Sequence, residues 1–157
     1  MALLQNTPIL LSIFSIFFAQ FIKVPIHLIV TKKLDWSFLT STGGMPSSHS
    51  AAVTSLATAV GFETGLDSPT FAVAAMFAGI VMYDATGVRY QAGQHAVIIN
   101  RIRSELSVFF REVKHWPDKD ENEKINELKT LLGHKPSEVF MGALTGIIIS
   151  ILYYNLF

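Results

Sequence analysis

Two histidines and an arginine lie in polar, glycine-containing stretches of a chain that is otherwise mostly apolar. His49 ends the run TSTGGMPSSH at positions 40–49, and Arg89 precedes His95 by six residues in RYQAGQH. A histidine can attack phosphorus or protonate a leaving oxygen, and arginine suits bidentate contact with phosphate. These residue types in this order therefore indicate chemistry on a phosphate group.

The polar loop before the first of these histidines is suited to bind an anion. Pro46 fits the first turn of a helix, where unpaired N–H groups and the positive helix end attract negative charge. Gly43 and Gly44 let backbone N–H groups approach an oxyanion, and the hydroxyls of Ser47 and Ser48 can donate to it. The simpler alternative is that Ser47 only caps the helix, because serine is a preferred cap.

The elements that carry these residues are predicted to be membrane helices. The chain has 157 residues, of which 50% are hydrophobic and 15% charged, and its mean hydropathy is +0.42. A soluble domain carries about 25% charged residues. Only 8 of the 24 charged residues lie in positions 1–100, and the other 16 lie between Arg101 and Glu138. The sequence predicts one all-α membrane domain over 1–157 with one water-facing segment.

The composition also argues against several other classes of protein. The net charge is zero and the basic residues form no long run, which gives nucleic-acid binding little support. The absence of cysteine excludes disulfide scaffolds, thiol catalysis and cysteine-ligated metals. No spacing of histidine and glutamate suggests a metal site, so we expect neither a metal nor a cofactor. No basic residue precedes Lys23, which argues against a removable signal peptide.

Four transmembrane spans are predicted, at about 9–30, 46–62, 69–88 and 138–157. The first is almost wholly apolar, and a helix of this length rises roughly 33 Å, enough to cross the hydrocarbon layer. The second is rich in alanine, serine and threonine, so we expect it inside the bundle and shielded from lipid. The fourth contains the small-residue pair Gly142 and Gly146, which is compatible with a homodimer.

The distribution of basic residues predicts the orientation. If the N-terminus is outside, four spans place 11 of the 12 lysine and arginine residues on one side, and the opposite loop, 63–68, has none. The chain is therefore predicted to be a multi-pass protein of the cell membrane, with a cytoplasmic charged segment over 89–135. Apolar residues at helical spacing predict an amphipathic helix over about 98–113 and a short helix over 125–132.

A few polar side chains fall at or next to membrane depth, where each costs a few kcal/mol, roughly, and needs a partner or a purpose. They are Lys23, His49, Asp84, Arg89 and His95. The first four are predicted to converge at the cytoplasmic side. Asp84 is expected to pair with Arg89 or Lys23, and on an unbroken helix it would share a face with His95 and could orient that imidazole.

The motifs resemble those of the superfamily of type-2 phosphatidic acid phosphatases and vanadium haloperoxidases. Residues 46–49, PSSH, are similar to its P-S-G-H signature, and Arg89 to His95 are similar to the R-x-x-x-G-x-H part of its third motif. The wider pattern GGMPSSHS, VMYDATGVRYQAG and LLGHKP resembles the divergent branch of small bacterial and plastid membrane proteins. The resemblance covers about residues 23–146.

The resemblance implies metal-independent hydrolysis of a phosphomonoester or pyrophosphate through a phosphohistidine. Its substrate would be an amphiphilic phosphate, such as phosphatidylglycerol phosphate or an isoprenoid phosphate, at the inner membrane face. His95 would be the nucleophile and His49 the general acid. The phosphate would be held by Arg89, Ser47, the backbone N–H of Ser48, and Lys23 as the lysine of the first motif.

The sequence departs from the family pattern at two places. The first-motif arginine is missing, since Val30 and Thr31 stand near its place, and Ile99 stands where an aspartate normally orients the nucleophile. These departures favour the alternative of a non-catalytic membrane protein that retains a phosphate-binding pocket, whereas the two histidines favour an enzyme. His134 in GHKP is interpreted as part of a helix-stop turn, with a position at the border of the site as the alternative.

Overall fold

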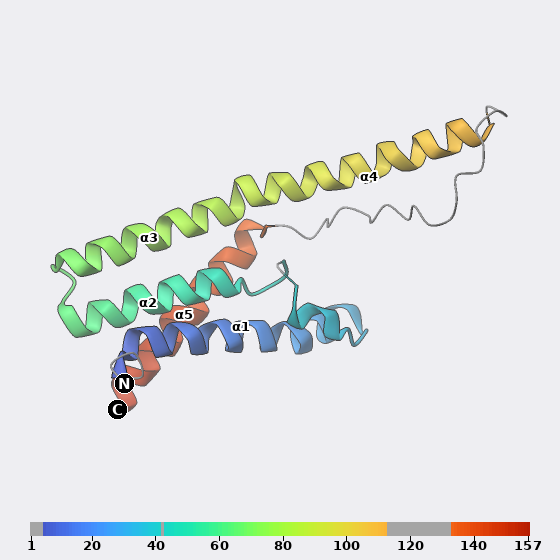
Figure 1. Ribbon diagram of the computed structural model, residues 1–157. Coiled ribbons are helices and arrows are strands. Elements are labelled where there is room, and N and C mark those ends of the chain that lie inside the picture. The colour runs from blue at the N-terminus through green and yellow to red at the C-terminus, as the bar shows by residue number, and fades with distance from the viewer. Residues whose placement is uncertain (1–4, 42, 113–132) are drawn as a thin grey trace.

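The computed structural model describes residues 5–41, 43–112 and 133–157, which fold into helices joined by turns (Figure 1). The helices are α1 (Thr7–Thr31), the 3₁₀ helix η2 (Trp36–Leu39), α2 (Ser48–Thr64), α3 (Pro69–Thr86), α4 (Val88–Glu112) and α5 (Pro136–Leu156). The predicted all-α class is confirmed. The short helix predicted over 125–132 lies outside the described residues.

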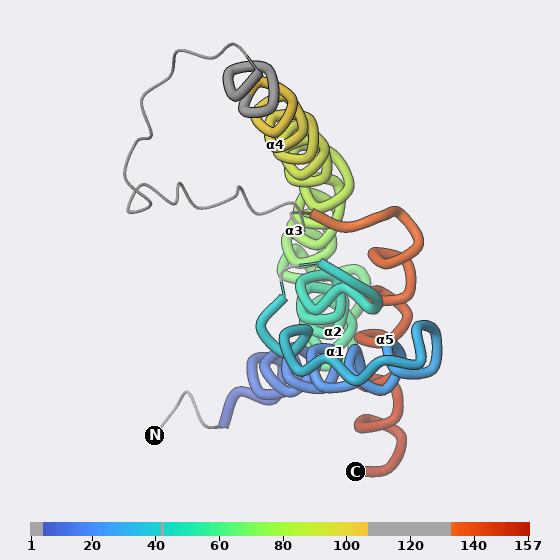
Figure 2. The backbone as a smooth tube through the Cα atoms, turned by 90° about the vertical axis from the view of Figure 1, so that its right-hand side faces the viewer, coloured from blue at the N-terminus to red at the C-terminus, as the bar shows by residue number. Residues whose placement is uncertain are grey.

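Helix α2 is the central element, and α1, α3 and α5 pack around it (Figure 2). Ten of its 17 residues are buried, and they are almost all alanine, serine, threonine or glycine. Such small residues let neighbouring backbones approach closely. A Cβ at Gly142 or Gly146 of α5 would collide with the backbone oxygen of Ser47 or Ala51 of α2. The predicted interior position of the second span is confirmed, and the small face of α5 is covered by α2 of the same chain.

Polar contacts inside the bundle join α2 to its neighbours. The hydroxyls of Ser55 and Ser150 lie 2.9 Å apart, and Thr54 donates to the Ala143 carbonyl at 3.0 Å. Hydrogen bonds of this kind between membrane helices contribute about 0.6 kcal/mol each on average. They fix the register of α5 against α2, and hence the position of the turn that precedes α5.

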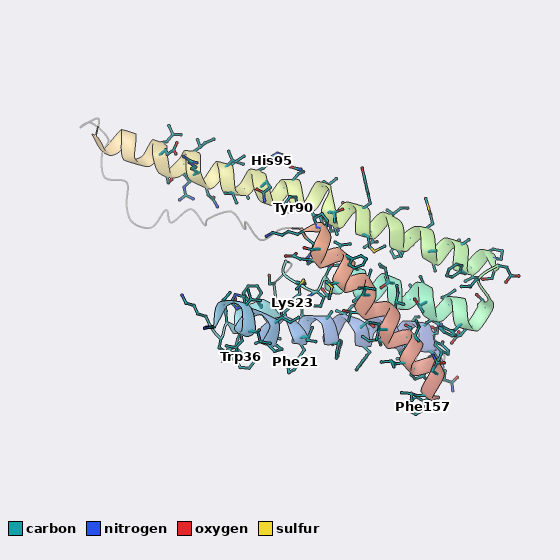
Figure 3. The ribbon with its side chains drawn as sticks, turned by 180° about the vertical axis from the view of Figure 1, so that it is seen from behind. Phe21, Lys23, Trp36, Tyr90, His95 and Phe157 are labelled. Carbon is teal, nitrogen blue, oxygen red and sulfur yellow. The ribbon has the colours of Figure 1, made fainter. Side chains whose placement is uncertain are left out.

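Three helical stretches are long and apolar enough to cross a membrane: α1, α5, and the stretch Pro69–Leu106 that α3 and α4 form together. Large apolar side chains of α1 face outward, as Phe21 does with 67% of its surface exposed (Figure 3). Helix α2 is shorter and less apolar than these. It runs antiparallel to its neighbours in sequence, since α1 and α3 point in the same direction and the chain returns along α2 (Figure 1).

The bundle therefore has two distinct ends. The start of α1, the turn between α2 and α3, and the end of α5 lie at one end (Figure 1). The starts of α2 and α5 and the junction of α3 with α4 lie toward the other. Arg89, Lys32 and Lys33 belong to this second end, which also carries most of the residues predicted to form the site.

Helix α4 continues beyond the bundle in nearly the same direction as α3 (Figure 1). Gly87 separates the two helices, with φ −94° and ψ −100°. The helix predicted over about 98–113 is confirmed as far as Glu112, although α4 begins ten residues earlier than expected. This direction decides where the residues after Gly87 lie relative to the site.

Candidate functional site

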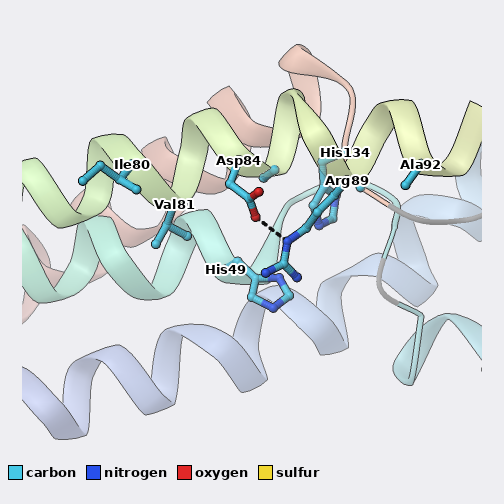
Figure 4. Close-up of a pocket in the computed structure, with 9 residues that line it drawn as sticks. His49, Ile80, Val81, Asp84, Arg89, Ala92 and His134 are labelled. Atoms are coloured by element: carbon cyan, nitrogen blue, oxygen red, sulfur yellow. Dashed lines mark hydrogen bonds and ion pairs between the residues drawn. The ribbon is translucent and has the colours of Figure 1, made fainter.

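A cavity of about 330 Å³ opens at the second end of the bundle, where α2 begins (Figure 4). It is lined by His49, Ile80, Val81, Asp84, Ala85, Arg89, Ala92, Gly133 and His134. These residues come from α2, α3, α4 and the turn before α5. Three of the predicted site residues, His49, Asp84 and Arg89, thus share one cavity.

Arg89 is held by Asp84 at the edge of this cavity. The guanidinium Nε donates to Oδ2 of Asp84 at 2.5 Å, and the two side chains are 62% and 40% exposed. An ion pair this exposed contributes at most about 1 kcal/mol to stability, so its main effect is on the position of the guanidinium. Figure 4 shows the guanidinium extending toward His49. Asp84 pairs with Arg89, one of its two predicted partners, and Gly87 interrupts the helix between Asp84 and His95.

His49 lies in the first turn of α2, which Ser47 caps. The Ser47 Oγ accepts the N–H of Ser50 at 3.3 Å and the Ser50 hydroxyl at 3.0 Å, and the Ser47 N–H donates to the Glu138 carbonyl at 2.9 Å. The hydroxyl of Ser47 therefore performs the capping role that was the simpler alternative. Ser47 and Ser48 are buried and are not among the residues that line the cavity. Within the described part of the chain, His49 is the residue of this turn that lines the cavity.

Lys23 and Gly44 position the loop that leads into α2. Lys23 is only 1% exposed, and its Nζ donates to the Ser41 carbonyl at 3.3 Å. Gln20 donates to the same carbonyl at 2.9 Å. Gly44 has φ +87°, a left-handed conformation that favours glycine. The charge of Lys23 interacts with the carboxylate of Glu138, although Lys23 and Gly44 are not among the residues lining the cavity.

His134 is a site residue that the sequence analysis placed in a helix-stop turn. It is 2% exposed, and its ring lies 6.3 Å from that of His49, centroid to centroid. Its Nδ1 is 3.0 Å from Oε2 of Glu138, while Nε2 has no hydrogen-bond partner among the described residues. Leaving a buried polar atom unpaired costs about 1–3 kcal/mol.

Gly133 brings this histidine against the junction of α3 and α4. It has φ +76°, and a Cβ there would collide with the backbone nitrogen of Tyr90 and the carbonyl carbon of Arg89. The next residue, His134, donates its N–H to the Ala85 carbonyl at 3.0 Å. The turn is therefore held to α3 by the hydrogen bond to Ala85 and packed closely on α4 at Gly133. The sequence signal for this was a carboxylate four residues after a histidine, in GHKPSE, with Pro136 starting α5.

His95 lies apart from the other predicted site residues. It is exposed on α4, beyond Tyr90 and away from the bundle (Figure 3). Ala92 is the last residue of the described part of α4 that lines the cavity. The structure therefore brings His49, Asp84 and Arg89 together with His134, and leaves His95 outside this group.

The assembled groups favour binding of an anion. The described lining residues include two imidazoles and one guanidinium, and the carboxylate among them, on Asp84, is paired with Arg89. Within the described ranges, no group of three or more histidine, aspartate or glutamate side chains is arranged to hold a metal ion. A phosphate is the kind of ligand that arginine and first-turn N–H groups bind well.

The fold and this cavity define an all-helical membrane protein with a candidate anion site at one end of its bundle. Residues 4–149 match the Divergent PAP2 family, and the chain belongs to that family. It is 58% identical over 151 residues to an "Uncharacterized membrane protein YuiD" of Bacillus subtilis (strain 168), a match that covers 96% of each chain. No solved structure matches the chain. The expected family is confirmed by this match.

Proposed function

We propose that this protein is a membrane phosphatase that hydrolyses a phosphomonoester or pyrophosphate of an amphiphilic substrate through a phosphohistidine. Membership of the Divergent PAP2 family supports a phosphatase-like protein in general terms. The observation that carries the more specific proposal is the cavity shared by two histidines and Arg89, beside the first turn of α2. A nucleophile, an acid and a phosphate-binding cation are the parts that this chemistry requires.

Each of these groups has a role that follows from its chemistry. Arg89, held by Asp84, and the N-terminus of α2 bind the phosphate oxygens and stabilise the charge that develops on them. One histidine attacks phosphorus, which avoids the need for a metal-bound water. His49 donates a proton to the leaving oxygen. Glu138 holds His134 in the turn that lines the cavity, and Lys23 holds the loop that leads into α2.

An amphiphilic substrate fits the place of the cavity in the bundle. The cavity wall includes Ile80 and Val81 of α3, and farther along α3 the side chains of Val73, Met76 and Phe77 are exposed. A lipid tail can lie along this apolar face while the phosphate enters the polar end, as in a phosphatidylglycerol phosphate or an isoprenoid phosphate. The excess of basic residues at this end supports a cytoplasmic site in a multi-pass protein of the cell membrane.

The second candidate is a non-catalytic membrane protein that binds a lipid phosphate in the same cavity. Two observations favour it. The arginine of the family's first motif is missing near Val30, and the predicted nucleophile, His95, is exposed outside the cavity. The presence of two histidines in the cavity favours the enzyme instead, because binding alone needs no nucleophile and no acid.

Phosphate release from a panel of lipid phosphates in detergent distinguishes the two candidates. We expect the wild type to release phosphate and His49→Ala to be slower by about 10²- to 10⁴-fold, the usual contribution of a general acid. His27→Ala is the matched control, since His27 stacks on Phe38 at 4.1 Å between centroids and is not among the cavity-lining residues. Folded wild-type protein that is protected against heat by vanadate, yet releases no phosphate, would establish the second candidate.

A further inference from the structure

We propose that His134, held by the carboxylate of Glu138, is the nucleophile that attacks phosphorus; this assignment rests on the proposed phosphatase function. His134 lines the cavity, is 2% exposed, and has an Nε2 with no partner among the described residues. The imidazole thus borders the cavity, and its buried Nε2 has no hydrogen-bond partner among the described residues that would occupy its lone pair.

The hydrogen bond to Glu138 determines which nitrogen carries the proton. A carboxylate only accepts hydrogen bonds, so the 3.0 Å contact of Nδ1 with Oε2 places the proton on Nδ1. The Nε2 lone pair is then free to attack. Glu138 is itself held, because Oε2 also accepts the Lys135 N–H at 3.2 Å and the Glu138 carbonyl accepts the Ser47 N–H at 2.9 Å. Glu138 is therefore a positioning residue for the nucleophile.

The turn that carries His134 is also fixed with respect to the other groups. Its N–H donates to Ala85, one residue after Asp84, and Gly133 packs on the backbone of Arg89 and Tyr90. The nucleophile, the phosphate-binding arginine and the arginine's partner are thus tied to one short stretch of backbone. Such preorganisation keeps the reacting atoms close to their geometry of attack.

The two histidines then complete a balanced reaction. Nε2 of His134 forms a bond to phosphorus, the bond from phosphorus to the leaving oxygen breaks, and that oxygen takes a proton from the imidazolium of His49. Water next attacks the phosphohistidine and gives a proton to the neutral His49. The P–N bond breaks, its electron pair returns to Nε2, and orthophosphate leaves. Glu138 stabilises the positive charge on the phosphorylated imidazole throughout.

His95 lacks each feature that supports His134. It is exposed, it is not among the residues that line this cavity, and Ile99 stands four residues after it in place of a carboxylate. His95 therefore provides a matched control of the same residue type.

The test compares His134→Asn with His95→Asn in phosphate release from the lipid phosphates that the wild type hydrolyses. Asparagine keeps a donor toward Glu138, so His134→Asn is expected to fold, to bind vanadate, and to lose about 1,000-fold or more of its rate. His95→Asn is expected to stay within about threefold of the wild type. Glu138→Gln is expected to lose roughly 10- to 100-fold, and Glu138→Asp to recover part of the rate.

The outcomes separate this assignment from the proposed function. A folded His134→Asn variant that releases phosphate at the wild-type rate overturns the assignment and leaves the phosphatase function standing. If His95→Asn loses activity and His134→Asn does not, the assignment is likewise overturned and the phosphatase function stands. A wild type that releases no phosphate from any lipid phosphate overturns the function and the assignment together. Heat protection by vanadate in each variant shows that the loss is one of chemistry and not of folding.

Discussion

Substituting alanine for Gly133 tests whether this turn builds the site. A non-glycine residue in the left-handed region costs about 1–2 kcal/mol, and at φ +76° the new Cβ would also collide with the backbone of Tyr90 and Arg89. These are backbone atoms of helix α4, which cannot move away at low cost. The turn must shift instead, and the hydrogen bond from His134 to Ala85, worth about 0.5–1.5 kcal/mol, is lost with it.

Together the left-handed conformation and the lost hydrogen bond amount to about 1.5–3.5 kcal/mol. The expected result is a melting temperature in detergent lower by about 3–14 °C, together with loss of heat protection by vanadate. Gly79→Ala is the matched control, because a Cβ at Gly79 meets no atom within 4 Å and α3 gains a better helix former there. A Gly133→Ala variant with the wild-type melting temperature and full vanadate protection would refute the close packing of this turn.

Three further changes have defined outcomes. Gly146→Leu should lower the melting temperature strongly, because its side chain would enter the backbone of α2 at Ala51, whereas Gly79→Leu should have little effect. Asp84→Asn should weaken protection by vanadate by roughly 5- to 10-fold while changing the unfolding free energy by less than about 1 kcal/mol, since the ion pair with Arg89 is exposed. Ser150→Ala should cost about 0.6 kcal/mol through loss of the contact with Ser55, measured by thermal unfolding.

Much of the fold could be predicted because the bilayer leaves few alternatives to helices. Hydropathy predicts the helices α1, α3 and α5, and the small residues of α2 predict its central place in the bundle. The boundary near Gly87 was less predictable. A glycine indicates that a helix can end, but it does not tell in which direction the next helix runs, and that direction depends on packing against the bundle.

The direction of α4 also explains which site residues could be predicted from the sequence. His49, Asp84 and Arg89 were predicted together because they lie at the ends of neighbouring helices, and the structure places them in one cavity. His95 was predicted as the nucleophile because Arg89 to His95 resemble the family's third motif, whereas α4 carries His95 away from the bundle (Figure 3). His134 lies 85 residues after His49, so proximity in sequence gave no reason to join them. Its place in the LLGHKP stretch and the carboxylate four residues later were the available signals.

Ser47 shows a different reason for an incomplete prediction. Its hydroxyl suits both a phosphate contact and a helix cap, and sequence cannot choose between two roles that need the same residue type. In the structure the hydroxyl caps α2, because the Ser47 Oγ accepts the Ser50 N–H with the two heavy atoms 3.3 Å apart. Lys23 is similar, since its charge was expected at the phosphate and its Nζ instead donates to the Ser41 carbonyl. Both residues act on the site through the elements that they hold.

Identifying the phosphorylated residue tests the central claim most directly. Wild-type protein is incubated briefly with a phosphate ester that it hydrolyses, stopped in alkali, where phosphohistidine is stable, and mapped by mass spectrometry. We predict phosphate on His134 and its absence from the His134→Asn variant. Phosphate on His95 or His49, or hydrolysis with no phosphohistidine formed, would contradict the account.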